Sequence, residues 1–118
     1  MDMDKRTNKN ISDYIASIAK QNSRLLKAYL FGSYARQLDK PESDIDIALV
    51  IENLDDDERF DLQVQLMLLA ARFDSRIEPH PVSSNDFDSS NPFIVEIKKT
   101  GIEIEPRTPN TWYSQQGF

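Results

Sequence analysis

Apolar and polar residues recur with two different periods along the chain, and these periods predict helices and strands in turn. Apolar residues at helical spacing predict an amphipathic helix over residues 10–22. Asp55 and Glu58 have the D-x-x-E spacing of a capping box, which predicts a helix over 56–73. A third helix is predicted over 91–101, because Asn-Pro begins this segment and glycine ends it.

Four further apolar runs have the length of strands. They are LLKAYLF (25–31), SDIDIALVIE (43–52), SRIEPHPV (75–82) and IEIE (102–105). We expect Pro79 and Pro81 to cut the third strand short. The segment SYARQL, which begins at Ser33, predicts one or two helical turns.

The predicted order is helix, strand, short helix, strand, helix, strand, helix, strand. This order predicts an α/β or α+β fold in which helices flank a small mixed β-sheet. The chain has 118 residues, which suits one domain. We expect that domain to cover 1–105, with a flexible tail over 106–118 that has two prolines and no periodicity.

Charge and composition narrow the functional classes. The net charge of −6, from 20 acidic and 14 basic residues, argues against a duplex-DNA binder but allows a nucleotide substrate bridged by a divalent cation. The absence of cysteine excludes disulfides and thiolate metal sites. No apolar run approaches the roughly 20 residues that span a bilayer, and MDMDKRTNKN has no apolar signal core, so we expect a cytoplasmic protein.

Two aspartates at the head of the second strand carry the clearest chemical signal. Asp44 and Asp46 are two apart, so in a strand they share a face and lie about 7 Å apart. Mg²⁺ prefers such oxygen ligands and leaves positions for substrate phosphates. The same pair alone also suits the solvent face of an ordinary strand. Gly32 and Ser33, at the end of the preceding strand, add a phosphate-binding turn and make the combined pattern more specific.

The combined pattern GSYARQ…SDIDIALV resembles the signature of nucleotidyltransferases with the DNA polymerase beta-type fold. It is most similar to minimal nucleotidyltransferases, which are often encoded beside a HEPN-domain protein. The resemblance covers residues 10–105, including RIEPHPVSSNDFD…NPFIVEIKKTGIEI. Gln37 departs from the usual final glycine of the motif, which puts the local turn in doubt but not the metal site.

The resemblance implies roles for individual residues. Gly32 and Ser33 match the phosphate-binding pair, and Asp44 and Asp46 match the metal-binding aspartates. Glu78 is the best match to the third carboxylate, where many members have aspartate. The weaker candidate for that position is Asp74, and Arg36 either neutralises phosphate charge or is a surface arginine.

The implied reaction is Mg²⁺-dependent nucleotidyl transfer, with two ions acting on the α-phosphate of ATP. Glu78 or a metal-bound hydroxide would accept the proton of the acceptor. The implied acceptor is a hydroxyl of a HEPN-type toxin, which would make this chain an antitoxin. A non-catalytic module that neutralises the partner by docking is the alternative, and a small-molecule nucleotidyltransferase of the aminoglycoside-inactivating kind is the third candidate.

The roles of several other residues have more than one interpretation. His80, the only histidine, is two residues from Glu78, and a structural role is favoured over contact with nucleotide. Tyr34 suits stacking, donation of its hydroxyl or an exposed surface position, and we expect Lys98 and Lys99 to be solvated at a helix end.

The helix over 56–73 has two apolar faces. One consists of Phe60, Val64, Met67, Leu68 and Ala71, and the other of Leu62, Leu66, Leu69 and Phe73. One face is expected to pack on the sheet. The second is covered either by the N-terminal helix or by another protein chain, through partner binding or self-association.

Overall fold

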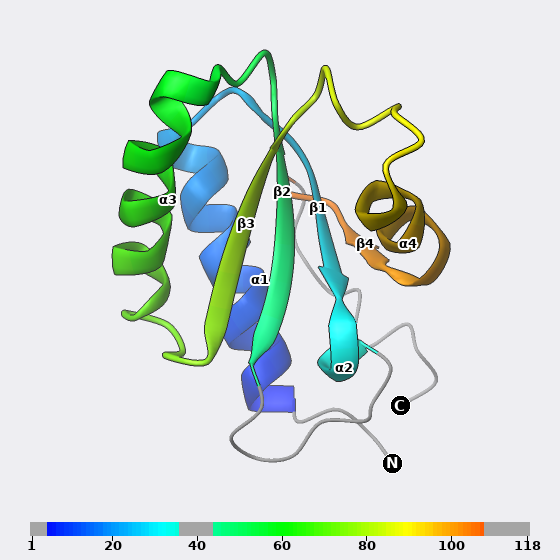
Figure 1. Ribbon diagram of the computed structural model, residues 1–118. Coiled ribbons are helices and arrows are strands. Elements are labelled where there is room, and N and C mark those ends of the chain that lie inside the picture. Colours follow the sequence, from blue (N-terminus) through cyan, green and yellow to red (C-terminus); the bar gives the residue numbers. More distant parts are fainter. Residues whose placement is uncertain (1–4, 36–43, 108–118) are drawn as a thin grey trace.

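The computed structural model describes residues 5–35 and 44–107, and its elements follow the predicted order (Figure 1). They are α1 (Lys5–Gln21), β1 (Leu25–Phe31), α2 (Gly32–Ala35), β2 (Ile45–Ile51), α3 (Asp56–Ala70), β3 (Ile77–Ser83), α4 (Pro92–Thr100) and β4 (Ile102–Ile104). The four strands form one sheet in the order β3-β2-β1-β4. β2 and β3 are parallel and joined through α3, while β1 is antiparallel to both β2 and β4. The predicted mixed sheet with flanking helices is confirmed.

The two faces of the sheet pack against different helices. Ile45, Ile47, Leu49 and Ile51 of β2 are fully buried in a core shared with α1 and α3. Ala48 and Val50 point the opposite way, into a second core with Ile94 and Ile97 of α4. Because successive strand residues alternate between faces, Asp46 lies on the α4 side of the sheet.

The predicted helix ends are largely correct, and side chains explain them. The backbone N–H of Asp55 donates to the Glu58 carboxylate at 3.0 Å, as in the predicted capping box. Arg24 donates to both oxygens of that carboxylate, and together these bonds lower the pKa of Glu58 to about 2. Asn91 accepts from the backbone N–H of Phe93 at 2.8 Å at the start of α4. The N-terminal helix begins at Lys5, five residues before its predicted start, and α3 ends at Ala70, three residues before its predicted end.

The prediction that prolines cut the third strand short is wrong, because β3 continues through Pro79 and Pro81 to Ser83. β3 is an edge strand, and a proline can stand at an edge where its missing N–H would face away from the neighbouring strand. The carbonyls of the two prolines confirm this orientation. Pro79 accepts from the side chain of Gln63, and Pro81 accepts from Arg59, both at 2.8 Å. Side chains of α3 therefore cover the backbone at this edge.

One apolar face of α3 packs on the sheet and the other is exposed. Leu66 and Ala70 are buried in the core with α1. The opposite face remains open, with Phe60 74% and Leu68 68% exposed. The prediction that the N-terminal helix covers this second face is therefore wrong. Its use as an interface stays a prediction.

Three remaining points concern single residues and segments. Tyr34 is buried, so the prediction of a surface tyrosine is wrong, and its hydroxyl donates to Oδ1 of Asn8 at 3.0 Å. Only the first two residues of the expected tail are described, and Arg107 donates to the carbonyls of Leu25 and Asn22.

Across residues 5–35 and 44–107, no helix is long and apolar enough to cross a membrane.

Candidate active site

The end of β1 and the starts of β2 and β3 meet at one end of the sheet (Figure 1). This follows from the topology, because β1 is antiparallel to β2 and β2 is parallel to β3. The register places Phe31 opposite Asp46 and Asp46 opposite Glu78. Residues far apart in sequence are thus neighbours across three adjacent strands.

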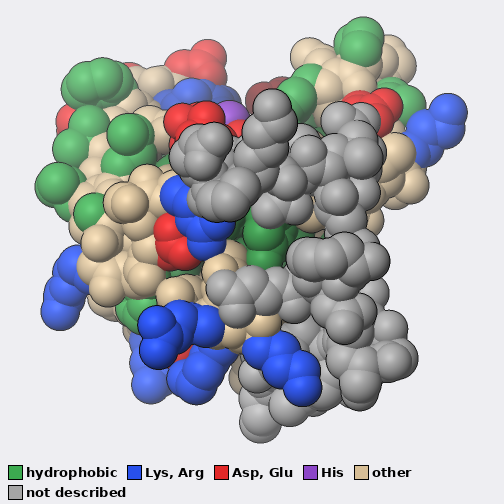
Figure 2. Space-filling view, turned by 90° about the horizontal axis from the view of Figure 1, so that it is seen from below, with side chains coloured by type: hydrophobic (Ala, Val, Ile, Leu, Met, Phe, Trp, Pro, Cys, Tyr) green, Lys and Arg blue, Asp and Glu red, His purple; other side chains and the backbone are tan. Residues whose placement is uncertain are grey.

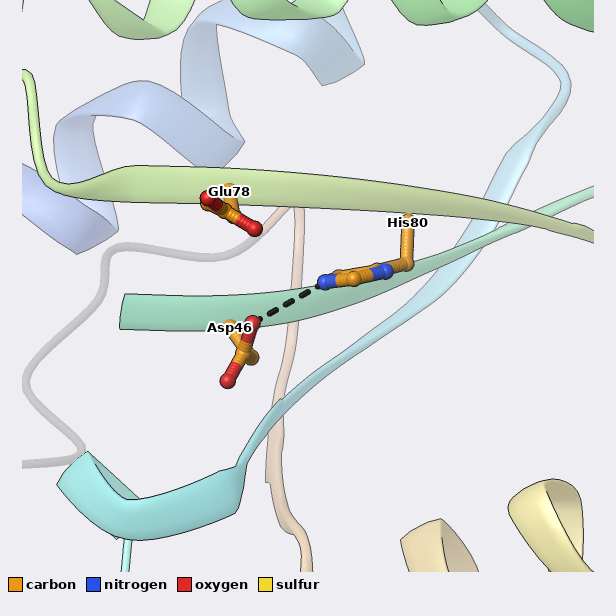
Figure 3. A group of neighbouring side chains, drawn as sticks. All are labelled: Asp46, Glu78 and His80. Atoms are coloured by element: carbon orange, nitrogen blue, oxygen red, sulfur yellow. Dashed lines mark hydrogen bonds and ion pairs between the residues drawn. The ribbon is translucent and has the colours of Figure 1, made fainter. Parts of the chain in front are cut away.

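Three side chains converge at this end of the sheet. Asp46 of β2 and Glu78 and His80 of β3 each offer a ligand atom, and these atoms all lie within 4.8 Å of one another (Figure 3). Nε2 of His80 lies 3.0 Å from Oδ1 of Asp46. Figure 2 shows the histidine, in purple, beside acidic side chains on this face of the molecule. We name Asp46, Glu78 and His80 the Asp-Glu-His cluster.

His80 lies within this cluster, although the sequence favoured a structural role for it. The available signal was its spacing of two from Glu78, which puts both side chains on one face of a continuous strand. The same strand face turns toward Asp46 through the parallel pairing of β2 and β3. The expected end of the strand at the prolines hid this relationship.

Gly32 adjoins the cluster at the end of β1. Its φ of +78° lies in the left-handed region, which glycine adopts without steric cost. A β-carbon at this position would lie 2.6 Å from Oδ2 of Asp46. The glycine therefore allows both the turn into α2 and the close approach of the Asp46 carboxylate to the backbone.

Asp44 lies just before β2, exposed, and is not a member of the Asp-Glu-His cluster. Its carboxylate is nevertheless near enough to affect Glu78. The pKa of Glu78 is raised above its ordinary value, first by partial desolvation and then by the negative charges of Asp44 and Asp46. A concentration of carboxylates that raises proton affinity is also one that a divalent cation would relieve.

The other predicted site residues fall into two groups. Ser33 belongs to α2, while Arg36 and Gln37 lie outside the described residues. Asp74 is held by Arg76, whose Nη2 lies 2.9 Å from its carboxylate, and this contact lowers the pKa of Asp74. Asp74 is thus engaged in a local ion pair.

Of the two lysines at the end of α4, Lys98 is engaged. It lies 3.3 Å from Asp88 and 4.7 Å from the centre of the Phe87 ring. Lys99 is exposed in the last turn of the helix, as expected. Neither residue belongs to the group of ligand atoms at the strand ends.

Two hollows lie close to the cluster. The smaller, of about 130 Å³, is lined by Glu78 and His80 together with Gln63, Met67 and Pro79, and so connects the cluster to α3. The larger, of about 560 Å³, lies between β3 and the start of α4, and Phe93 is one of its walls. The Phe93 ring lies 6.2 Å from that of His80, which brings this hollow near the cluster as well.

The donor set fits a divalent cation. Two carboxylates and an imidazole converge from rigid strands, and each of these groups is a common metal ligand. Asp44 supplies a further carboxylate near Glu78. The cluster is also partly open to solvent, since the side chain of Asp46 is 27% exposed and that of His80 36%.

A family model described as "Polymerase beta, Nucleotidyltransferase" matches residues 13–108. The chain belongs to this family. The resemblance expected from GSYARQ…SDIDIALV is thereby confirmed at the level of the nucleotidyltransferase domain, and the matched range contains Gly32, Asp46 and Glu78.

Solved structures are similar to this nucleotidyltransferase domain along most of its length. A structure from Sulfolobus solfataricus assigned as a nucleotidyltransferase has a TM-score of 0.60 at 22% identity, covering 91% of this chain and 93% of that one. A toxin-antitoxin with AMP-PNP has a TM-score of 0.54 at 26% identity, and a mutant of the toxin-antitoxin MntA-HpeT has 0.55 at 24%. Each of these two comparisons covers 78% of this chain and 70% of the other. No curated protein matches the chain.

Proposed function

We propose that this nucleotidyltransferase moves a nucleoside monophosphate, AMP from ATP, to a hydroxyl of a partner protein. The partner would be a HEPN-type toxin and this chain its antitoxin. The observation that carries the proposal is the convergence of Asp46 and Glu78 beside Gly32, at the position where the family's sequence pattern predicts a metal and phosphate site. ATP is favoured because one structural relative, a toxin-antitoxin, was solved with AMP-PNP.

The transfer is a substitution at the α-phosphorus of ATP. The acceptor oxygen forms a bond to that phosphorus while the bond to the oxygen bridging the α- and β-phosphates breaks, and pyrophosphate leaves. The acceptor hydroxyl loses its proton in the same process. Glu78 would accept that proton, and the raised pKa of its exposed carboxyl supports this role.

Asp44, Asp46 and Glu78 are the residues that would hold divalent cations, Mg²⁺ in the simplest case and two ions in the full site. When bound, such ions neutralise charge on the reacting phosphates and on the departing pyrophosphate. Gly32 keeps the Asp46 carboxylate against the turn after β1. Ser33 and Arg36 are proposed to contact the phosphates.

A protein acceptor is favoured by the surface beside the cluster. Met67 belongs both to the exposed apolar face of α3 and to the small hollow lined by Glu78 and His80. A protein seated on that face would lie next to the reacting groups. Exposed apolar side chains of this size and contiguity commonly mark protein interfaces.

The alternative is a module that neutralises its partner by docking alone. Clustered carboxylates have no purpose in that account, because their mutual repulsion costs stability without a bound cation. The two accounts separate in one experiment. The chain is incubated with ATP, a divalent metal and a candidate HEPN-domain partner, and the intact mass of the partner is measured.

An AMP adduct that depends on Asp46 supports transfer. Neutralisation of the partner without any adduct, and equally by the Asp46→Asn variant, supports docking instead. Asp88→Asn is the matched control, because it removes the same charge from an exposed position on the loop before α4.

A further inference from the structure

We propose that His80 is a metal ligand, and that its imidazole nitrogen makes this site prefer Mn²⁺ and similar transition-metal ions over Mg²⁺. The proposal rests on the proposed function only in that the cluster holds a divalent cation. It changes the expected chemistry of the site, because the three residues predicted to bind metal, Asp44, Asp46 and Glu78, offer oxygen alone. A nitrogen donor selects a different class of ion.

The separation of the donor atoms supports shared coordination. Nε2 of His80 lies 3.0 Å from Oδ1 of Asp46 (Figure 3). Two neighbouring ligands of a six-coordinate ion, each roughly 2.1 Å from it, are about 3 Å apart. Glu78 also offers an oxygen within the same 4.8 Å group. The three donor atoms therefore lie close enough together for their side chains to share one ion.

The imidazole is held in this position by its surroundings. Pro79 and Pro81 flank His80 on β3, and each has a fixed φ angle that stiffens the backbone. The Phe31 ring meets the imidazole edge-on at 5.2 Å, and the Phe93 ring lies 6.2 Å away. These contacts orient the ring while leaving 36% of the side chain exposed, so an ion and its water ligands have access from solvent.

The ligand chemistry then determines the choice of ion. Mg²⁺ is a hard cation that binds oxygen almost exclusively and is seldom held by imidazole. Imidazole binds Mn²⁺ and binds the later divalent metals of the first row more strongly. When Nε2 carries the metal, the proton of the neutral ring resides on Nδ1.

A purely positioning role for His80 makes different predictions. In that case the ring donates a hydrogen bond to Asp46 and aligns its carboxylate for whichever ion binds. Loss of the ring would then weaken Mg²⁺ and Mn²⁺ binding alike, and His80→Gln, which keeps an N–H donor, would restore much of the loss. Under direct ligation, the loss falls mainly on Mn²⁺.

The sequence makes the test direct, because His80 is the only histidine among the 118 residues. The full chain is produced without a histidine tag, loaded with Mn²⁺ and studied by pulsed electron paramagnetic resonance. We expect coupling of the Mn²⁺ electron spin to ¹⁴N, replaced by ¹⁵N coupling when labelled histidine is incorporated. Absence of nitrogen coupling in the wild-type protein would overturn the proposal.

Two variants complete the test by titration with Mn²⁺ and with Mg²⁺. His80→Phe keeps an aromatic ring between Phe31 and Phe93, and His80→Gln keeps a donor toward Asp46. Both should weaken Mn²⁺ binding by on the order of 10-fold or more and Mg²⁺ binding much less. Equal losses for the two ions, or full Mn²⁺ affinity in His80→Phe, would contradict ligation by nitrogen.

These readouts detect bound metal and not turnover. A chain that transfers no nucleotide can still show nitrogen coupling, in which case the proposed function fails and the ligand assignment stands. An active transferase whose ion is held by oxygen alone shows no coupling. The two proposals can therefore fail separately.

Discussion

Gly32 lies so close to Asp46 that a β-carbon at position 32 would be 2.6 Å from the carboxylate oxygen Oδ2. We predict that Gly32→Ala lowers the free energy of unfolding by about 1–2 kcal/mol, because alanine is strained at a φ of +78°. The same change displaces Asp46 from the cluster. Divalent-metal affinity, measured by titration of folded protein, should therefore fall as well. Unchanged metal affinity in a folded variant would show that the close packing does not set the position of Asp46.

Asp46 is predicted to be essential for transfer and dispensable for folding. Asp46→Asn keeps the shape of the side chain but removes the negative charge that a cation would need. Nucleotidyl transfer should fall by at least about 100-fold, as for the loss of groups that support metal binding. Circular dichroism and partner binding should be retained. Asp88→Asn, with the same change in charge, should keep wild-type activity, and a similar loss in both variants would rule out a specific role for Asp46.

Glu78 gives the clearest pH dependence. Its pKa is raised above the ordinary 4.5 in the folded chain, so the folded state binds this proton more tightly than the unfolded state. In metal-free protein, this group therefore lowers stability as pH rises from about 4.5 through the raised pKa. Glu78→Gln removes the ionisation and should have a higher Tm than wild type at neutral pH, with the difference shrinking toward pH 4.

A bound divalent cation should reverse the order of the Tm values of wild type and Glu78→Gln. With saturating divalent cation, the wild-type carboxylate is stabilised by the ion, and Glu78→Gln should then have the lower Tm. Thermal unfolding between about pH 4 and 8, with a chelator or with metal, checks both halves of this prediction. A variant that is no more stable than wild type without metal would contradict the repulsion inferred among Asp44, Asp46 and Glu78.

The exposed face of α3 is predicted to bind the protein partner. Leu68→Glu places a charge at a side chain that is 68% exposed, so the free energy of unfolding should change by only about 0.5 kcal/mol. Binding to the partner should weaken strongly, because a charge would be buried in an apolar contact. Gln65→Glu adds the same charge at an exposed neighbour on the helix and serves as the control. Equal partner affinity for wild type and Leu68→Glu, measured by calorimetry, would place the interface elsewhere.

Periodicity predicted the order of the elements because each helix and strand has its own local pattern. The D-x-x-E spacing at Asp55 and the Asn-Pro pair at 91 located two helix starts for the same reason, since capping is a local interaction. The error at β3 arose because its proline carbonyls are covered by α3 and its edge position is set by the whole sheet. Neither fact is visible in the segment itself.

The candidate site likewise was predicted in part from local sequence and depends in part on tertiary packing. The spacing of Asp44 and Asp46 predicted a carboxylate pair, yet β2 begins at Ile45 and leaves Asp44 just outside the strand. The residues grouped most closely with Asp46 are Glu78 and His80, which reach it through the parallel register with β3. That register depends on tertiary packing, so local spacing could predict the type of chemistry but not the full set of side chains.

The most direct test of the proposed function is the fate of each phosphate of ATP. Lysate of the source organism, or the purified HEPN-domain partner, is incubated with the chain, divalent metal and ATP labelled either at the α- or at the γ-phosphate. Transfer of AMP predicts that the α-label enters a protein and that the γ-label does not. With the Asp44→Asn/Asp46→Asn double variant, no protein should be labelled from either position. Entry of γ-label would indicate phosphoryl transfer instead. No label from either position, with the partner still neutralised, would contradict catalysis and favour docking alone.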